Sequence, residues 1–479
     1  MALLKNLASL TGAEIVSKLL TFAAFAHVAR VAGPDAFGMV EFAGAVLLCA
    51  SLIVDQGFSP YGAREIAKSP QRTAVLAAEI VGVRCVLALA AYGGIVAFAW
   101  GLERSSVLTR LILLYGLSLF AMPFLLQWVF QGHDRMQVVA AAQVIRQGVF
   151  AIVVLAGVRQ AGQIWLVAVA EVAGTTSAAA YSLWMYARHF GKGLRPRLAI
   201  SRQLCRESVP IGLSQMLWVV RMVGATLIVG LVATADDLGL FAGAQRILVA
   251  AHAFVWLYFF NLLPALARAW QDGRAAFAHL LAESMHGITW LAAASGVVWI
   301  VLAPTVMSGV YGSAFAAAGP TLACLAGVCV AAAISGPYRF GLIAAGYQTT
   351  EMVTAAVGAF IAVAGIPLGY RLSGPQGAAM ALCAAELAVW LSAWWCARQL
   401  LGASDHASLL VRPALAALVA LIVATSSPTA ATLRAAVAGA CVVAIALALD
   451  RDARRRLRAA VTAVTTMRRQ HSKSAHPPH

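Results

Sequence analysis

The chain has 479 residues, of which 61% are hydrophobic and only 11% are charged. Its mean hydropathy of +0.82 lies far above that of water-soluble domains, so the composition excludes a soluble globular protein and indicates an integral membrane protein. The net charge of +16 does not require a nucleic-acid partner, because it follows from the membrane topology argued below.

Hydrophobic runs long enough to cross a bilayer follow one another almost from end to end. A spanning helix takes about 20 mainly apolar residues, and short polar or Gly/Pro-containing segments separate the runs. The predicted fold is an all-α polytopic membrane protein. We expect fourteen transmembrane helices, at 9–30, 36–57, 76–99, 108–131, 137–158, 162–187, 207–232, 238–263, 283–304, 317–345, 351–371, 375–398, 409–426 and 431–449.

The first run begins after a single early lysine, as a signal peptide would. Glu14 and Lys18 interrupt its apolar part, and no small-residue cleavage pattern follows them. We therefore expect a retained first span.

Basic residues are distributed unevenly over the connecting segments. If both termini are cytoplasmic, the inner segments hold most of the 35 Lys and Arg residues, including the linker 188–206 and the tail after Arg451. This bias agrees with the positive-inside rule and predicts that orientation. The tail is either a disordered anchor or an amphipathic segment on the inner leaflet, which anionic lipids would attract.

Catalytic chemistry outside the membrane has little room. The longest connecting segments, about 20 and 30 residues, are too short for a catalytic domain. The stretch "GKGLRPR" lacks the upstream glycine and the Ser/Thr of a P-loop, no HExxH or GxSxG motif occurs, and the eight cysteines form no CxxC pair. We expect a transporter without cofactor or metal, and the alternative is an enzyme embedded in the membrane.

Charged side chains within the predicted spans carry the functional information. A charge at the bilayer centre costs about 2.5 to 3.5 kcal/mol on insertion scales, so we expect these groups to face protein or water. The basic ones outnumber the acidic ones, which predicts a cationic cavity, and guanidinium groups suit phosphate. They are Lys18, Arg84, Arg146, Arg221, Arg246 and Arg339, against Glu14, Glu79, Glu171 and Glu386.

Several of these charges have a purely structural alternative. Glu14 and Lys18 are one helical turn apart, so Lys18 serves either Glu14 or an anionic ligand. Arg84 could form an ion pair within the helix packing. The remaining four arginines have no opposite charge three or four positions away on their own helices, which favours a cavity or an anionic ligand for them.

Two stretches, "ARVAGPDAFGMVEFA" (29–43) and "LIVDQGFSPYGAREIAKS" (52–69), resemble the start of the polysaccharide transporter family of oligosaccharide flippases. This family belongs to the multidrug/oligosaccharidyl-lipid/polysaccharide exporter superfamily. Both the order and the spacing of the two motifs agree. The matching residues include Arg30, Gly33, Pro34, Phe37, Gly38, Asp55, Gly57, Arg64 and Glu65.

The resemblance implies two six-helix bundles related by a pseudo-two-fold axis, followed by two added helices. In this chain the N-terminal bundle (spans 1 to 6) would be 1–190 and the C-terminal bundle (spans 7 to 12) 207–400. A basic cytoplasmic linker, 191–206, would join them. Spans 13 and 14 would lie in 401–450, and a basic cytoplasmic tail would occupy 451–479.

The resemblance also implies a function: moving an undecaprenyl-diphosphate-linked oligosaccharide across the bacterial inner membrane for O-antigen, capsule or exopolysaccharide synthesis. The six basic residues would line a cavity that opens alternately to the two sides of the membrane. A proton or sodium gradient is an open energy source, with the four glutamates as candidates. Membrane lipids, a polysaccharide polymerase and export machinery would be its partners, and no nucleic acid.

Two other functions stay open. One is a multidrug or small-metabolite exporter of the same superfamily, although cationic drugs would favour an acidic cavity. The other is a membrane-embedded polymerase or ligase of the same pathway, although such enzymes typically use a large external loop.

Overall fold

The computed structural model describes residues 2–102, 105–191, 223–402, 407–426 and 430–449, with 194–198, 204, 206–209, 212, 213, 216 and 219 between them. The predicted tail 451–479, Arg221 and parts of the predicted seventh span and of the linker lie outside the described residues. In the described part the regular structure is helical throughout, as the composition predicts.

Two compact units make up the chain. The first comprises Met1–Gln245, Met307–Ala318 and Ala362–Ala378, and the second Arg246–Val306, Gly319–Ile361 and the described part of Ala379–His479. Three segments of the predicted C-terminal bundle therefore belong to the first unit: the described part of 207–245, Met307–Ala318 and Ala362–Ala378. The division into bundles at 190 and 207 stays a prediction.

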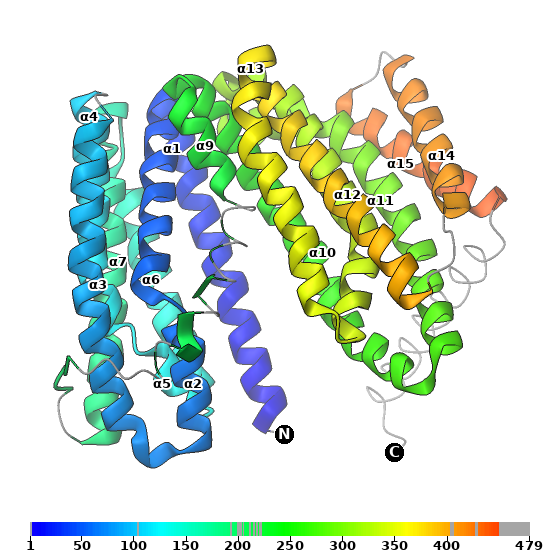
Figure 1. The fold of residues 1–479 in the computed structure, drawn as a ribbon. Coiled ribbons are helices and arrows are strands. Elements are labelled where there is room, and N and C mark those ends of the chain that lie inside the picture. The colour runs from blue at the N-terminus through cyan, green and yellow to red at the C-terminus, as the bar shows by residue number, and fades with distance from the viewer. Residues whose placement is uncertain are drawn as a thin grey trace, which may run out of the picture. The chain divides into compact units, whose positions relative to one another are not determined.

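The first unit is built around a long N-terminal helix, with neighbouring helices running alongside it (Figure 1). Its helices are α1 (Ala2–Asp55), α2 (Phe58–Lys68), α3 (Thr73–Gly101), α4 (Ser106–Gly116), α5 (Gln127–Gly132), α6 (Met136–Gly157), α7 (Trp165–Phe190) and α9 (Gly224–Val232). Helices α2 and α5 pack together, at the end of the unit drawn at the bottom of Figure 1.

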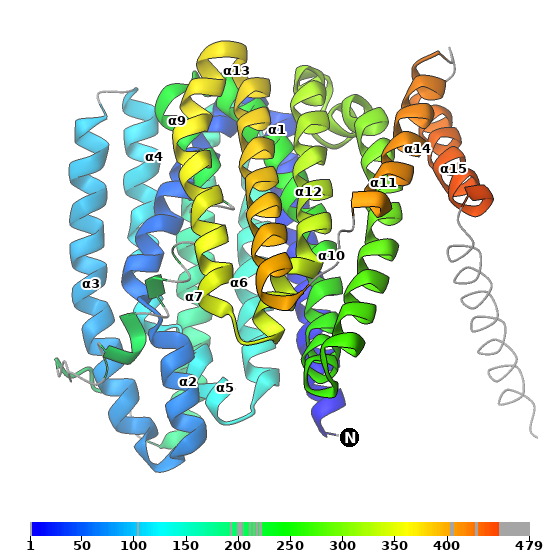
Figure 2. The ribbon, with the colours of Figure 1, turned by 45° about the vertical axis from the view of Figure 1, so that its right-hand side comes forward.

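The remaining helices start with one that begins in the first unit and continues into the second. They are α10 (Ala235–Asp272), α11 (Arg274–Tyr311), α12 (Gly319–Ala344), α13 (Gln348–Leu401), α14 (Ala407–Ser426) and α15 (Ala431–Leu449). Figure 2 shows α14 and α15 side by side. Small residues such as Ala420 and Ala438 form a buried cluster there with Val297 of α11.

Within the described residues, ten helical stretches are long and apolar enough to cross a membrane. Two of them, Gly12–Lys68 and Gln348–Leu401, are each longer than one crossing, because a helix of 50 residues would extend about 75 Å, more than twice the hydrocarbon thickness. Each is divided internally by a break in the helical backbone. The chain is therefore a multi-pass membrane protein.

The same dipeptide makes both internal breaks. Gly33 has φ 78° and is followed by Pro34, and Gly374 has φ 58° and is followed by Pro375. Glycine adopts positive φ without a Cβ penalty, and proline at a first-turn position loses no hydrogen bond. Gly33-Pro34 falls between the first and second predicted spans, so the sequence locates this turn correctly.

The predicted span 108–131 agrees with the candidate membrane span Ser106–Gly132, but it is not one continuous α-helix. Helix α4 ends at Gly116, the 3-10 turns η2 (Leu117–Phe120) and η3 (Met122–Phe124) follow, and α5 begins at Gln127. Pro123 in η3 lacks an amide hydrogen and cannot continue an α-helical ladder. Hydropathy alone does not detect such a break, because the residues remain apolar.

Candidate functional site

The first motif forms a junction between helices within the first unit. Arg30 Nε donates to the carbonyl oxygen of Val310 at 2.7 Å, and its Nη2 donates to the carbonyl oxygen of Gly309. These carbonyls lie in the last turn of α11, where the helix dipole is negative and the carbonyls lack helical partners. Arg30 therefore caps the C-terminal end of α11.

Glycine lets the backbones meet at this junction. A Cβ on Gly38 would overlap the carbonyl oxygen of Ala235, and a Cβ on Gly239 would overlap that of Pro34. Helices α1 and α10 thus touch through bare backbone, as small-residue motifs allow in membrane proteins.

Aromatic rings fill the other side of the junction. Phe37 is fully buried; its ring lies edge-on to that of Phe315 at 5.7 Å and tilted against that of Tyr311 at 5.8 Å. Phe315 belongs to η5 (Ser313–Ala318). Phe37 and Gly38 of the first motif are therefore packing residues.

A polar contact that the sequence does not reveal lies in the same unit. Tyr370 Oη donates to Asp237 Oδ2 at 2.7 Å and accepts a bond from the amide of Thr234 at 3.3 Å. No spacing rule joins these residues, since they come from α10, the turn before it and α13. A tyrosine near a predicted span end is the only sequence signal.

The second motif holds an ion pair with a buried arginine and a partly buried aspartate. Arg84, 4% exposed, pairs through Nη2 with Asp55 Oδ1. Arg84 Nη2 also donates to Ser59 Oγ at 2.7 Å, and Ser59 Oγ donates to Asp55 Oδ1 at 2.8 Å. Gly57, with φ 76°, lies between the end of α1 at Asp55 and the start of α2 at Phe58. The geometry favours the packing alternative for Arg84.

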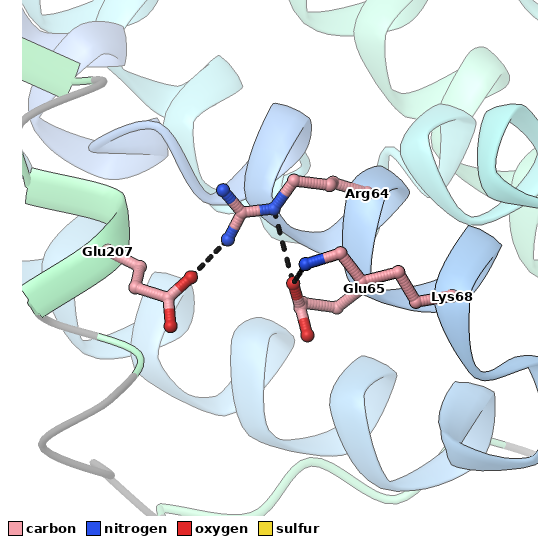
Figure 3. Close-up of polar contacts among 4 residues, drawn as sticks. All are labelled: Arg64, Glu65, Lys68 and Glu207. Carbon is pink, nitrogen blue, oxygen red and sulfur yellow. Dashed lines mark hydrogen bonds and ion pairs between the residues drawn. The ribbon is translucent and has the colours of Figure 1, made fainter.

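Helix α2 presents a charged group to the segment that follows the linker (Figure 3). Arg64 pairs with Glu207 and, at 3.2 Å, with Glu65; Glu65 also receives Lys68 Nζ at 2.9 Å. The Arg64 guanidinium lies over the ring of Tyr61. This cluster joins two segments far apart in sequence.

Charge reversal tests the Arg64 contact with Glu207. Arg64→Glu is expected to speed amide exchange in α2 by less than about fivefold, because an exposed ion pair contributes little. The exchange of Arg64→Glu/Glu207→Arg should return to the wild-type rate, as measured by hydrogen exchange with mass spectrometry.

Arg72→Glu makes the same change of net charge at an exposed site beside this cluster. It should leave the exchange of α2 unchanged. Faster exchange in both single variants and in the double variant would contradict a specific contact between Arg64 and Glu207.

A second polar group lies between α6 and α7. Arg146 Nη2 donates to Glu171 Oε1 at 2.6 Å, and Thr175 Oγ1 donates to the same oxygen at 3.1 Å. The side chains of Arg146 and Glu171 are 31% and 17% exposed. A Cβ on Gly174 would press against the Arg146 carbonyl oxygen, so glycine permits the close approach of the two helices.

The second unit contains a comparable pair. Arg339 Nε and Nη2 donate to Glu351 Oε1 at 2.9 and 2.5 Å. Both side chains are 16% exposed. Glu351 was not singled out by the sequence, because it lies at the start of α13 whereas Arg339 lies on α12.

The other predicted charges differ in their surroundings. Glu14 and Lys18 pair at 2.9 Å, with side chains 51% and 65% exposed. This geometry matches the alternative in which Lys18 pairs with Glu14. Glu386 is 3% exposed, and its Oε1 has no hydrogen-bond partner among the residues described. Glu79 and Arg246 are partly buried, on α3 and α10.

Among the described residues, Lys18, Arg84, Arg146 and Arg339 each have a carboxylate partner. For the last three, the partner comes from another helix. The structure brings Arg146 together with Glu171, which the sequence predicts as separate candidates. It adds Asp55 and Glu351 as partners. Arg146 belongs to the first unit and Arg339 to the second.

Comparison with known proteins gives the class. Lipid II flippase MurJ in an inward closed conformation matches with a TM-score of 0.71 at 11% identity, over 92% of this chain and 99% of that one. An inward-facing MATE-family multidrug resistance transporter of the MOP superfamily matches with a TM-score of 0.64 at 14% identity, over 81% and 94%. The Vibrio cholerae MATE transporter VcmN, as a D35N mutant, matches at 0.52 and 16% identity, over 85% and 98%.

At these identities the solved structures establish the fold alone, and a search of curated proteins finds no match. The fold is that of the MurJ- and MATE-like membrane transporters. A family model described as "Polysaccharide biosynthesis protein" matches residues 3–270, more than half of the chain. The protein belongs to this polysaccharide biosynthesis protein family, which confirms the resemblance found in the sequence.

Proposed function

We propose that this transporter is a flippase for an undecaprenyl-diphosphate-linked oligosaccharide in O-antigen, capsule or exopolysaccharide synthesis. It would carry the lipid-linked sugar from the inner to the outer leaflet of the bacterial plasma membrane. The observation that supports this most directly is the family match over residues 3–270, in a chain whose fold is like that of a lipid II flippase.

The proposal includes a topology. Fourteen spans form two six-helix bundles, at 1–190 and 207–400, with two added helices, and both termini are cytoplasmic. The uneven distribution of Lys and Arg supports this orientation. A polymerase and export machinery would receive the translocated sugar.

In this proposal, cations of the predicted spans bind the diphosphate while the polyprenyl tail stays in lipid. Guanidinium groups remain charged in a low dielectric and donate paired hydrogen bonds to phosphate oxygens. Arg84 is assigned a structural role, because its buried side chain is paired with Asp55. A proton or sodium gradient would drive transport through Glu14, Glu79, Glu171 or Glu386. The proposed binding residues are Lys18, Arg146, Arg221, Arg246 and Arg339.

The test is translocation of a defined undecaprenyl-diphosphate oligosaccharide by the full chain in proteoliposomes. Arg146→Glu and Arg246→Glu should each lower the rate at least about tenfold, because charge reversal repels a buried anion. Arg268→Glu, an exposed position with the same change of charge, should transport normally. Normal transport by both cavity variants would contradict the binding assignment.

The MATE-like fold favours one rival, a multidrug exporter. That rival predicts that a strain lacking this chain becomes drug-sensitive while its surface polysaccharide is unchanged. The flippase proposal predicts loss of the polysaccharide and unchanged drug sensitivity.

A further inference from the structure

The Arg146 guanidinium is only partly used by its protein partners. Arg146 carries five N–H donors, and the Nη2 donor contacts Glu171 Oε1. Its Nε is buried and has no hydrogen-bond partner within the described part of the chain. Glu171 Oε1, in contrast, accepts two bonds, one from Arg146 and one from Thr175. Arg146 therefore has N–H donors that no described residue accepts, whereas Glu171 accepts a hydrogen bond from Thr175 in addition to the one from Arg146.

Arg146 lies away from the exposed apolar side chains of α6. Leu155 is 41% exposed and Ile152 is 68% exposed. Nine residues of α-helix turn by about 900°, so Arg146 lies about half a turn around the helix from Leu155. The 31% exposure of the Arg146 side chain is thus on the side of α6 opposite Leu155.

A further polar contact lies at the same level. Thr21 of α1 has its hydroxyl 2.9 Å from Gln147 Oε1, one residue along from Arg146. The hydroxyl of Ser17, one turn earlier on α1, is buried and without a partner among the described residues. Helices α1, α6 and α7 all contribute polar groups here, so this level of the bundle is suited to a polar ligand.

We propose that Glu171 is a built-in competitor for the ligand's oxyanion at Arg146. This inference rests on the proposed function and adds how the same site loads and unloads. In the empty protein, Glu171 occupies the position on the guanidinium that a phosphate oxygen takes in the loaded one. On binding, the diphosphate displaces Glu171, which keeps its hydrogen bond from Thr175.

The exchange has a physical reason. A partly buried cation without a counter-ion is strongly unfavourable, so Arg146 needs a partner whenever the ligand is absent. A partner inside the protein keeps the empty site stable, and its return to Arg146 favours release of the ligand. In the empty protein Glu171 Oε1 accepts from both Arg146 and Thr175. Once the ligand takes Arg146, the Thr175 hydroxyl is the remaining donor and its bond to the charged carboxylate strengthens, which lowers the cost of the displaced state.

The test measures binding of geranyl diphosphate and of inorganic pyrophosphate to the full chain in lipid nanodiscs. Glu171→Gln removes the competing charge and should tighten binding of both probes about tenfold. Thr175→Val removes the donor that holds displaced Glu171, so it should weaken binding severalfold. Opposite signs at two neighbouring positions of α7 are not expected from a merely structural role.

Three controls complete the experiment. Glu171→Asp keeps the carboxylate and should bind close to wild type, and Asp272→Asn makes the same change of net charge at an exposed position and should bind as wild type does. In Arg146→Gln/Glu171→Gln the gain should disappear. Equal or weaker binding by Glu171→Gln, or a gain that persists without Arg146, would overturn the inference.

Failure of the proposed function would look different. In that case the wild-type chain would not translocate an undecaprenyl-diphosphate oligosaccharide, whatever the ratio of affinities between Glu171→Gln and wild type. If Glu171→Gln is recovered poorly from membranes, Thr175→Val decides the inference by itself, since wild-type or tighter binding by that variant contradicts it.

Discussion

Asp55→Asn is expected to destabilise the protein by about 3 to 5 kcal/mol, the range typical when one partner of a buried ion pair is removed. Arg84 is 4% exposed and would keep its charge with only Ser59 as a described hydrogen-bond partner. The measurement is unfolding of the purified protein in mixed micelles with increasing denaturing detergent. Asp55 belongs to the second motif, so this result would show that this motif residue stabilises the fold.

Two comparisons make the result specific. Glu14→Gln breaks an ion pair of which both side chains are more than half exposed, and it should cost less than about 1 kcal/mol. The double variant Asp55→Asn/Arg84→Met should recover much of the loss, since no unpaired charge is left buried. Equal losses for Asp55→Asn and Glu14→Gln would contradict a buried pair.

Gly38→Ala has the second largest expected effect. Its new methyl group would overlap the carbonyl oxygen of Ala235, and backbone cannot move aside as a flexible side chain can. The start of α10 must then separate from α1, which we expect to cost about 1 to 3 kcal/mol as overpacking does. The same unfolding measurement detects the loss.

Gly44 is the matched position on the same helix. A Cβ there meets nothing within 4 Å, so Gly44→Ala should be neutral or stabilising by about 0.5 to 1 kcal/mol through helix propensity. If Gly38→Ala is as well tolerated as Gly44→Ala, then the backbone contact between α1 and α10 is not formed in the membrane.

Local features of the fold could be predicted from the sequence. The turn at Gly33-Pro34 was located because positive φ and the lost amide hydrogen are properties of those two residues themselves. The predicted span 108–131 agrees with the candidate span Ser106–Gly132, whereas the break in its α-helix near Pro123 does not follow from hydropathy. Proline within a membrane helix often gives only a kink, so the packing around it decides the outcome.

The candidate site was predicted only in part. Testing each charge at three or four positions along its own helix identified the Glu14 pair with Lys18. The same test cannot find the pair of Arg146 with Glu171 or of Arg339 with Glu351, because these residues lie 25 and 12 positions apart on different helices. The excess of cations in the sequence thus overstates the unpaired charge.

The sequence by itself determined that the protein lies in a membrane, that it is helical, where the turn at Gly33-Pro34 falls and which family it resembles. These properties depend on the free energy of transferring each residue from water to lipid and on its own backbone preferences. Residues that lie nearby in the folded protein change both of these little. The tertiary structure alone decided which carboxylate meets which cation, and that Arg30, Gly38 and Asp55 hold helices together. Those contacts depend on which helices pack against each other, and hydropathy leaves that open because a lipid-facing side and a protein-facing side are almost equally apolar.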